Sequence, residues 1–449
     1  MVSDGEKVVP GYTSPRSSAR LPRTQTTSSP PVRQAADILR AGERTTSNTR
    51  ARMHILALNT GSSSLKFAVY DMSCTAPDGQ TPLRSGAVEG IGGSDIRVRL
   101  GGRDAAPIPG LAIGDQAAAL RWLTADLGRE HMWERLTAIG HRIVHGGAKY
   151  RRPVRITSSV RGALETLIPL APRHLPDELR AVDAMASLAP TLPQIACFDT
   201  AFHRDIPLEA SWYAIPRALS EAGVVRYGFH GLSYEYIAQE LNARGALGER
   251  TIVAHLGNGA SMAALRDGRS VDTSMGFTPI GGFAMGTRSG DLDPGIMLYL
   301  LRERSLSVDE LNSMVTKDGG LLGISATSSD MRDLLERSAT DRRAAEAVGV
   351  FCYQVRRFLG AYVAVLGGLD TLVFTGGIGE NSAEIRARIC ESLDCFGIRI
   401  DRALNDAGAE VISVDGTAVA VRVMPTNEEL MIARHTARVL EPISGGDHD

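Results

Sequence analysis

The stretch from Met53 to Asp71, MHILALNTGSSSLKFAVYD, places a turn of small polar residues between two apolar runs. Short β-rich runs on either side of an Asn/Gly/Ser cluster predict a hairpin. The turn offers hydroxyl groups, backbone N–H groups and the cation of Lys66, an arrangement that suits a phosphate group. An ordinary polar hairpin turn explains this segment alone equally well. Neither a Walker A loop nor a G-x-G-x-x-G motif occurs in the chain.

A second stretch, Thr251 to Asp267, has the same pattern of apolar run, polar turn and apolar run. Its turn, His255 to Ser261, is again rich in glycine and small polar residues. Two such hairpins about two hundred residues apart suggest a duplicated domain with a nucleotide held between the halves.

Length and charge narrow the possible functions. A chain of 449 residues is expected to form two domains, because single cores rarely grow past about 300 residues. A net charge of −2 provides no field for nucleic acid or for an anionic membrane. The five cysteines include no C-x-x-C pair, which predicts reduced thiols and a cytoplasmic protein.

The first 52 residues differ in composition from the rest. They are rich in Ser, Thr, Pro and Arg and lack apolar periodicity, so we expect residues 1–52 to form a disordered N-terminal extension. An Arg-rich, acid-poor leader is also typical of a transit peptide. Because Met53 directly precedes the first apolar run, an over-extended start or a dispensable tail is the preferred interpretation.

Three polar residues follow or interrupt apolar runs in the middle of the chain. Arg142 lies inside the run Ile139–Val144, where it needs a partner, and it either holds an anionic ligand or forms a structural ion pair. Asp199 ends the buried run that begins at Ile195, a position typical of chemistry in α/β sheets and equally of a helix N-cap. His230 lies between glycines, which allows close approach to a ligand, although such histidines are usually structural.

The C-terminal part has two further signals. Phe374 to Asn381, FTGGIGEN, predicts a buried strand, a Gly-rich turn and then a helix from about Ser382, a geometry that binds anions. The acids Glu428 and Glu429 precede a last helix that is predicted to end near Leu440. They either cap that helix or reach a Mg²⁺ ion.

Nine motifs together resemble the acetate kinase family, in that family's order, from about Met53 to the C-terminus. They are NTGSSSLKF, GHRIVHGG, FDTAFH, RYGFHG, AHLGNGAS, GTRSGDLDP, SSDMR, GGIGEN and PTNEE. The resemblance implies an α/β fold of two duplicated ribonuclease-H-like domains, as in actin, Hsp70 and sugar kinases, around a nucleotide cleft. It implies an acyl-substrate domain at 53–200, which a C-terminal helix at 430–442 joins, and a nucleotide-binding and dimerisation domain at 201–429.

The resemblance also implies roles for individual residues. The implied catalytic residues are Asp199, His230 and Arg288. The implied acyl-substrate residues are Arg142, His174, Val144, Phe229 and Pro279. The implied ATP-binding residues are Lys66, His255, Leu256, Gly257, Asn258, Gly259, Asp330, Met331, Arg332, Gly377, Ile378, Gly379, Glu380 and Asn381. The implied metal contacts are Asn59 and Glu428.

The implied reaction is reversible, Mg²⁺-dependent transfer of the ATP γ-phosphoryl group to acetate, which gives acetyl phosphate and ADP; Mn²⁺ is a possible substitute for Mg²⁺. Because acetate is already ionised near neutral pH, positioning and charge neutralisation are the main catalytic tasks. Family members are usually homodimers, and we expect the same here. The alternatives are a propionate or butyrate kinase and, from another class, an Hsp70- or actin-like nucleotide switch.

One position departs from the family pattern. Where the family usually has L-A-P-L-H-N-P, this chain has Leu170-Ala171-Pro172-Arg173-His174-Leu175-Pro176. Arg173 replaces an apolar residue of the pocket that receives the acetate methyl group. It either swings to solvent along its aliphatic stem or alters the pocket. Acyl-chain preference is therefore open, and we expect Arg173→Leu to shift the acetate-to-propionate rate ratio.

Overall fold

Each predicted hairpin lies at the centre of its own β-sheet. In the first, His54–Thr60 (β1) pairs antiparallel with Ser64–Asp71 (β2), and in the second Arg250–Leu256 (β9) pairs antiparallel with Ala260–Arg266 (β10). Both hairpins are confirmed. The computed structural model describes residues 52–61, 63–73, 81–93, 96–104 and 113–441, all of which belong to one compact unit.

Five neighbouring strands of the first sheet and the five described strands of the second share one order and one set of pairing directions. In the first sheet the order β3-β2-β1-β6-β8 combines two antiparallel pairs with two parallel pairs. The second sheet repeats it as β11-β10-β9-β12-β13. This repeated topology establishes the duplicated fold that the hairpins suggested. The short similarity between the two hairpin sequences could not establish it alone.

Within the described residues, the first sheet has eight strands in the order β5-β4-β3-β2-β1-β6-β8-β7. Its remaining strands are Arg84–Glu89 (β3), Arg97–Leu100 (β4), Arg103–Asp104 (β5), Leu136–Ile143 (β6), Val154–Arg155 (β7) and Gln194–Phe198 (β8). The second sheet has five strands, of which the other three are Arg269–Thr273 (β11), Thr371–Thr375 (β12) and Ala420–Val423 (β13).

The helices of the first half accompany the first sheet or lead to the second. They are Gln116–Arg129 (α1), Ser158–Glu165 (α2), Leu175–Leu188 (α3), Leu208–Ser211 (α4), Arg217–Glu221 (α5) and Gly231–Ala243 (α6). Short 3₁₀ turns lie at Trp133–Arg135, Ile168–Leu170 and Ala201–His203.

The helices of the second half surround the second sheet, except for the last one. They are Pro294–Glu303 (α7), Val308–Thr316 (α8), Gly320–Ser325 (α9), Met331–Arg337 (α10), Arg342–Leu366 (α11), Gly376–Asn381 (α12), Ala383–Cys390 (α13), Arg402–Asp406 (α14) and Glu428–Leu440 (α15). A 3₁₀ turn lies at Asp394–Phe396.

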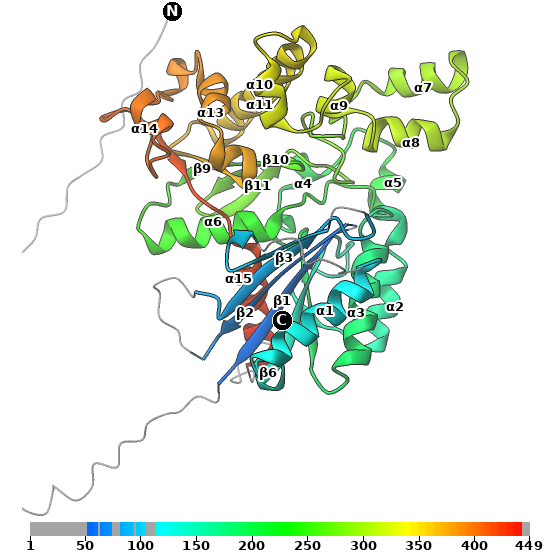
Figure 1. The fold of residues 1–449 in the computed structure, drawn as a ribbon. Helices are drawn as coiled ribbons and strands as arrows, with labels where there is room; N and C mark the ends of the chain where they lie inside the picture. Colours follow the sequence, from blue (N-terminus) through cyan, green and yellow to red (C-terminus); the bar gives the residue numbers. More distant parts are fainter. Residues whose placement is uncertain (1–51, 62, 74–80, 94–95, 105–112, 442–449) are drawn as a thin grey trace, which may run out of the picture. The chain divides into compact units, whose positions relative to one another are not determined.

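Apolar side chains on both faces of the first sheet are buried by helices. Leu56, Leu58 and Phe67 pack into one cluster with apolar residues of α1 and α3. On the opposite face, Ile55 and Ala57 pack with Leu430 and Met431 of α15. Helix α15 therefore returns to the first sheet, as Figure 1 shows by its position beside β1 and β2.

Several element predictions can be compared with the structure. The helix predicted from Gln116 to about Leu127 continues to Arg129, with Asp115 as its N-cap. The last helix ends at Leu440 as predicted. The Gly-rich turn predicted after Phe374 is wrong, because residues Gly376–Asn381 themselves form α12, and Ser382 caps the separate helix α13. Gly376 makes this possible, because its φ of +78° lies in the region that glycine favours.

Two further predictions are not decided by the fold. The extension at 1–52 lies outside the described residues but for its last position, and the domain boundaries at 200 and 429 stay predictions. Among the described residues, no helix combines the length and the apolar character needed to cross a lipid bilayer.

Candidate active site

A cavity of about 680 Å³ lies between residues of both sheets. The first sheet contributes the ends of β1 and β2, and the second contributes the turn between β9 and β10. The lining residues are Asn59, Gly61, Ser63, Ser64, Lys66, Arg142, Arg173, His174, His230, His255, Gly257, Asn258, Gly259, Thr287, Arg288, Gly376, Gly377, Glu380, Thr426, Glu428 and Glu429. The two hairpin turns that the sequence singled out therefore face one space.

Arg142 of β6 is fixed by Asp199, which follows β8. The Arg142 Nε donates to both carboxylate oxygens at 3.0 Å, and Nη2 donates to Oδ2 at 2.5 Å. Asp199 is fully buried, so it serves Arg142 rather than capping a helix. Burial alone would lower the pKa of Arg142, but the carboxylates of Asp199 and Glu428 outweigh it and raise that pKa above its usual value. Arg142 is thus a permanent cation held at the edge of the cavity.

Asn59, at the end of β1, links Arg142 to the first turn of α15. Its Oδ1 accepts from Arg142 Nη1 at 3.2 Å, and its Nδ2 donates to Glu428 Oε2 at 3.0 Å and to Glu429 Oε1 at 3.4 Å. The N-cap of α15 is Asn427, so neither glutamate caps the helix. Both carboxylates instead reach the cavity.

The two glutamates differ in the direction in which their pKa values are shifted. Burial would raise the pKa of Glu428, but the cations Arg142 and Lys66 and the hydrogen bond from Asn59 lower it below its usual value. Burial and the adjacent Glu428 charge raise the pKa of Glu429. Two neighbouring carboxylates and an amide oxygen at one cavity edge are the donor types that Mg²⁺ prefers, so these residues fit a hard divalent cation. A cation there would also relieve the repulsion between the two acids.

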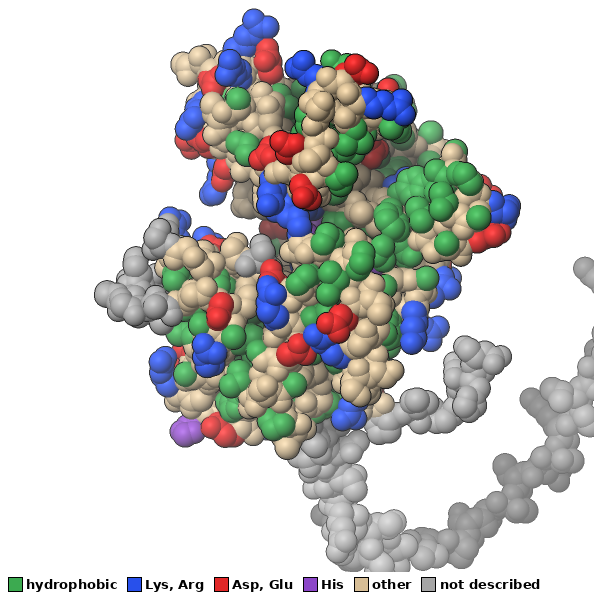
Figure 2. Space-filling view, turned by 90° about the vertical axis from the view of Figure 1, so that its right-hand side faces the viewer, with side chains coloured by type: hydrophobic (Ala, Val, Ile, Leu, Met, Phe, Trp, Pro, Cys, Tyr) green, Lys and Arg blue, Asp and Glu red, His purple; other side chains and the backbone are tan. Residues whose placement is uncertain are grey.

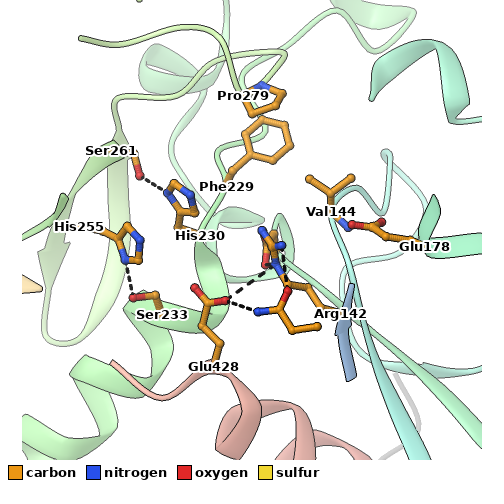
Figure 3. A network of polar contacts seen from close by, with 12 residues as sticks. Arg142, Val144, Glu178, Phe229, His230, Ser233, His255, Ser261, Pro279 and Glu428 are labelled. Carbon is orange, nitrogen blue, oxygen red and sulfur yellow. Dashed lines mark hydrogen bonds and ion pairs between the residues drawn. The ribbon is translucent and has the colours of Figure 1, made fainter. Parts of the chain in front are cut away.

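His230 and His255 stack at the same wall of the cavity, with ring centroids 4.4 Å apart. Ser261 Oγ lies 2.8 Å from His230 Nδ1, and Ser233 Oγ lies 2.9 Å from His255 Nδ1, as Figure 3 shows. Burial, the His255 ring and the charges of Arg142 and Arg288 hold the pKa of His230 well below its usual value. His230 is therefore neutral near neutral pH, with Nε2 left to face the cavity.

A close backbone contact places His230 beside Asp199. His230 has a φ of +58° and directly precedes α6, and the N–H of Gly231 donates to the Asp199 carbonyl at 2.9 Å. A side chain at position 231 would meet that carbonyl at 2.1 Å, so only glycine fits. This explains the glycine that follows the histidine in the sequence.

Arg288 converges with His230 on the turn of the second hairpin. A methyl group added at Gly259 would lie 3.5 Å from both Arg288 Nη1 and His230 Nε2. Arg288 Nη1 also donates to the Pro279 carbonyl at 3.0 Å. Burial, followed by the charges of Arg173 and Arg142, lowers the pKa of Arg288 to about 10, so it stays protonated near neutral pH. Arg288 Nη1 and His230 Nε2 thus both face the space above Gly259.

The predicted apolar residues lie behind this polar surface. Val144 and Phe229 are buried in one hydrophobic cluster and do not line the cavity. Pro279 contributes its carbonyl to Arg288, and its ring appears next to Phe229 in Figure 3. The backbone N–H of Val144 donates to Glu178 Oε2 at 2.9 Å, and burial raises the pKa of Glu178 to about 8.

The predicted ATP-binding residues divide into two groups. Lys66, His255, Gly257, Asn258, Gly259, Gly377 and Glu380 line the cavity. Leu256, Asp330, Met331, Arg332, Ile378, Gly379 and Asn381 do not line it. Asp330 instead caps α10, with Oδ1 accepting from the Arg332 backbone N–H at 2.8 Å, and it pairs with the Arg332 side chain.

The sequence analysis assigned no role to several residues that line the cavity or support the side chains in it. Ser233 and Ser261 orient the two histidines, Thr287 lines the cavity, and Glu178 lies behind Val144. Glu178 carried a usable signal, because an acid in the first turn of an amphipathic helix suggests a special position. The serines carried none, since nothing in their neighbourhood distinguishes a buried hydroxyl from an ordinary one.

The fold and the cavity define a class. Two sheets of one topology around a cavity lined by arginines, histidines and paired acids fit a phosphotransferase, because such groups position and neutralise phosphoryl oxygens. Two solved structures are similar over nearly the whole described fold. The crystal structure of a propionate kinase from Francisella tularensis gives a TM-score of 0.80 at 37% identity, and covers 86% of this chain and 100% of that one. The crystal structure of Porphyromonas gingivalis acetate kinase gives 0.77 at 36% identity, covering 87% and 100%.

The sequence comparisons are more specific. The family model described as "Acetokinase family" matches residues 54–434. An acetate kinase of Rhodopseudomonas palustris is 45% identical over 400 residues, which cover 86% of this chain and 98% of that protein. An acetate kinase of Clostridium acetobutylicum is 42% identical over 404 residues, which cover 86% and 99%. The chain belongs to the acetokinase family. The predicted family, fold class and kinase activity are confirmed.

Proposed function

We propose that this chain transfers the γ-phosphoryl group of ATP directly to acetate, reversibly, giving acetyl phosphate and ADP. The observation that carries the proposal is the convergence of Arg288 Nη1 and His230 Nε2 above Gly259 in a cavity that also holds Arg142. Charge on a transferring phosphoryl group lies mainly on its equatorial oxygens, which is what two such donors would meet.

Arg142 supplies the contact for the acid. Its guanidinium is oriented by Asp199 and Asn59 before any substrate arrives, and its side chain keeps 16% of its surface exposed. Because the guanidinium is already fixed, a carboxylate that binds it is held in line for transfer without a further loss of side-chain entropy in the protein. Asp199 acts here as the residue that orients Arg142, because three hydrogen bonds commit its carboxylate to that side chain.

His230 and Arg288 meet the charge that develops during transfer. Arg288 contributes a full positive charge, whereas His230 contributes a neutral N–H donor, because its pKa lies far below neutrality. Neither group needs to gain or lose a proton during the reaction. The nucleotide side of the cavity consists of Lys66, the turn Gly257–Gly259 and the glycines at the start of α12.

Asn59, Glu428 and Glu429 would hold the Mg²⁺ ion. The ion would neutralise the β- and γ-phosphoryl oxygens of the bound nucleotide. Glu428, whose pKa is lowered, is ionised and is the stronger ligand of the two acids. Asn59 positions it through the bond from Nδ2. We assign Mg²⁺ as the physiological ion, with Mn²⁺ as a substitute of similar coordination.

We infer further that two copies form a homodimer through an apolar face. Helix α7 has no buried residue, and exposed apolar side chains lie on it, beside it and on the short helices before it. They are Leu208, Ile215, Leu219, Leu292, Ile296, Leu298, Tyr299 and Val308. Figure 2, turned toward the side on which α5, α7 and α8 lie in Figure 1, shows hydrophobic side chains gathered there. Patches of this kind mark association surfaces.

We also propose a cytoplasmic location, because Cys197, Cys352, Cys390 and Cys395 are free thiols.

Propionate is the second candidate acceptor, because the similar structure from Francisella tularensis is that of a propionate kinase. The test is acyl-phosphate formation, trapped as hydroxamate, by the purified chain with Mg-ATP and acetate, propionate or butyrate in parallel. Higher kcat/KM with acetate is the expected result. Preference for a longer acid would keep the mechanism and change the acceptor. Absence of any acid-dependent product would contradict the proposal.

A further inference from the structure

Arg173 brings a third guanidinium to the cavity, from the segment that precedes α3. It lines the cavity together with Arg142 and Arg288. Its Nη1 donates to the carbonyl of Thr316 at 2.6 Å, a contact between residues 143 positions apart in the chain. The side chain is exposed, but its contact with Thr316 holds it at the cavity, so it neither lies free in solvent nor fills an apolar pocket.

The Thr316 carbonyl has a second donor. Thr287 Oγ1 lies 3.1 Å from it, and Thr287 is the immediate neighbour of Arg288. Thr316 is the last residue of α8 and is itself buried. The segment that carries Arg173 and His174 is thus tied, through one carbonyl, to the loop that carries Arg288.

The charge of Arg173 lowers the pKa values of two other residues that line the cavity. After burial, it is the largest influence that lowers the pKa of Arg288, ahead of Arg142. It also contributes, after burial, Arg288 and Arg142, to lowering the pKa of His174 to about 3. Nη1 is the Arg173 atom with a described protein partner, and that partner is a neutral carbonyl rather than a carboxylate. The positive charge is consequently left for a ligand.

We propose that Arg173 is a specificity-determining residue that favours the acyl phosphate over the free acid as a ligand of this site. The inference rests on the proposed function. Acyl phosphate carries about two negative charges near neutral pH and a free acid about one, so an added cation strengthens binding of the former more. Because Arg173 shares the Thr316 carbonyl with Thr287, the neighbour of Arg288, its charge lies on the side of the cavity that we assign to the phosphoryl group.

Three substitutions separate charge from contact. Arg173→Leu removes both the charge and the bond to Thr316. Arg173→Gln removes the charge but keeps an N–H donor, and Arg173→Lys keeps the charge. The KM and kcat of each full-length variant are measured with ATP and acetate in one direction, and with ADP and acetyl phosphate in the other.

For Arg173→Leu and Arg173→Gln, the KM for acetyl phosphate is expected to rise about tenfold, and the KM for acetate less than about threefold. Arg173→Lys is expected to stay within about threefold of the unsubstituted chain for both. The KM for acetyl phosphate should also rise more steeply with ionic strength in the unsubstituted chain than in Arg173→Leu.

Equal increases in both KM values would overturn the inference, because they indicate a role in positioning alone. If Arg173→Gln kept the KM for acetyl phosphate of the unsubstituted chain and Arg173→Lys did not, the inference would also be overturned. The bond to Thr316 would then matter and the charge would not. If the unsubstituted chain turned over neither substrate, the proposed function would fail and the inference with it. A failure confined to the variants' KM pattern leaves the proposed function intact.

Discussion

Arg142 and Asp199 form the ion pair around which the acyl side of the cavity is built. They come from neighbouring parallel strands, β6 and β8, whose register brings Arg142 beside Cys197 and leaves Asp199 just past the strand end. The carboxylate is fully buried, while the guanidinium reaches the cavity. One partner is thus structural and the other is presented to substrate.

Asp199→Asn tests whether Asp199 orients Arg142 rather than contacting the substrate itself. The substitution keeps the shape of the side chain and removes the nearest counter-charge of the partly buried guanidinium, which typically costs about 3 kcal/mol of unfolding free energy. We expect kcat to fall about 100-fold or more, since Arg142 loses its orientation. Chemical denaturation and steady-state kinetics measure the two effects.

The matched control is Asp183→Asn, which breaks the exposed pair between Asp183 and Arg161. Exposed pairs contribute about 0–1 kcal/mol, so this variant should keep both its stability and its kcat. Similar small losses in both variants would contradict the assigned role of Asp199.

Gly259→Ala should separate activity from stability. The added methyl group meets its nearest neighbours, Arg288 Nη1 and His230 Nε2, at an ordinary contact distance of 3.5 Å, so the fold accepts it. It occupies the space where the two donors converge, and we expect kcat to fall about tenfold or more with the melting temperature nearly unchanged.

Gly349→Ala is the control, because it lies within α11 with open space around it. It should keep full activity and gain slightly in stability, as Gly-to-Ala changes in helices usually do. Full activity in Gly259→Ala would place the phosphoryl group elsewhere.

Glu428→Gln should weaken the metal site. Glu428 has a lowered pKa and is ionised near neutral pH, so its neutralisation is expected to raise the Mg²⁺ concentration at half-maximal rate about tenfold or more. Glu429→Gln should have a smaller effect, because burial and Glu428 already disfavour its charge. A titration of rate against Mg²⁺ at saturating substrates measures both. An effect larger in Glu429→Gln would reverse the assignment.

Glu178 predicts a dependence of stability on pH. Burial raises its pKa from 4.5 to about 8 in the folded chain, so the fold favours the protonated form. Between these values the unfolded chain releases the proton and the folded chain keeps it, so unfolding becomes easier as pH rises. Glu178→Gln cannot ionise and lacks this loss.

The melting temperature of Glu178→Gln relative to the unsubstituted chain should therefore increase from about pH 6 to about pH 8. The corresponding difference is about 1.4 kcal/mol for each pH unit. Thermal melts of both proteins across this range measure it. A constant difference would show that Glu178 is already ionised in the fold.

The sequence predicted the parts of the fold that local chemistry determines. Asn-Thr-Gly-Ser and His-Leu-Gly-Asn-Gly each force a turn between apolar runs, so both hairpins and their place in two equivalent sheets were accessible. The helix at Gly376–Asn381 was not, because three glycines predict a turn, and only packing against β9 and β12 shows that this segment is helical.

The site was predictable where side-chain type limits the alternatives. A cation inside an apolar run, such as Arg142, needs a partner, and an acid at a neighbouring strand end can supply it. Asp330 was assigned from the resemblance alone: its carboxylate caps α10 and pairs with Arg332, and its contact with ATP stays a prediction. Arg173 could not be placed either, since a long flexible side chain takes its position from Thr316, which is remote in sequence.

The central claim is that phosphoryl transfer in this cavity needs an acid to receive the group. ADP release from Mg-ATP, measured with and without acetate, tests it most directly. We predict that acetate increases ADP release at least about 100-fold, with saturation and with one acyl phosphate formed for each ADP. Equal rates with and without acetate, while ATP is bound, would contradict the claim and favour a nucleotide switch.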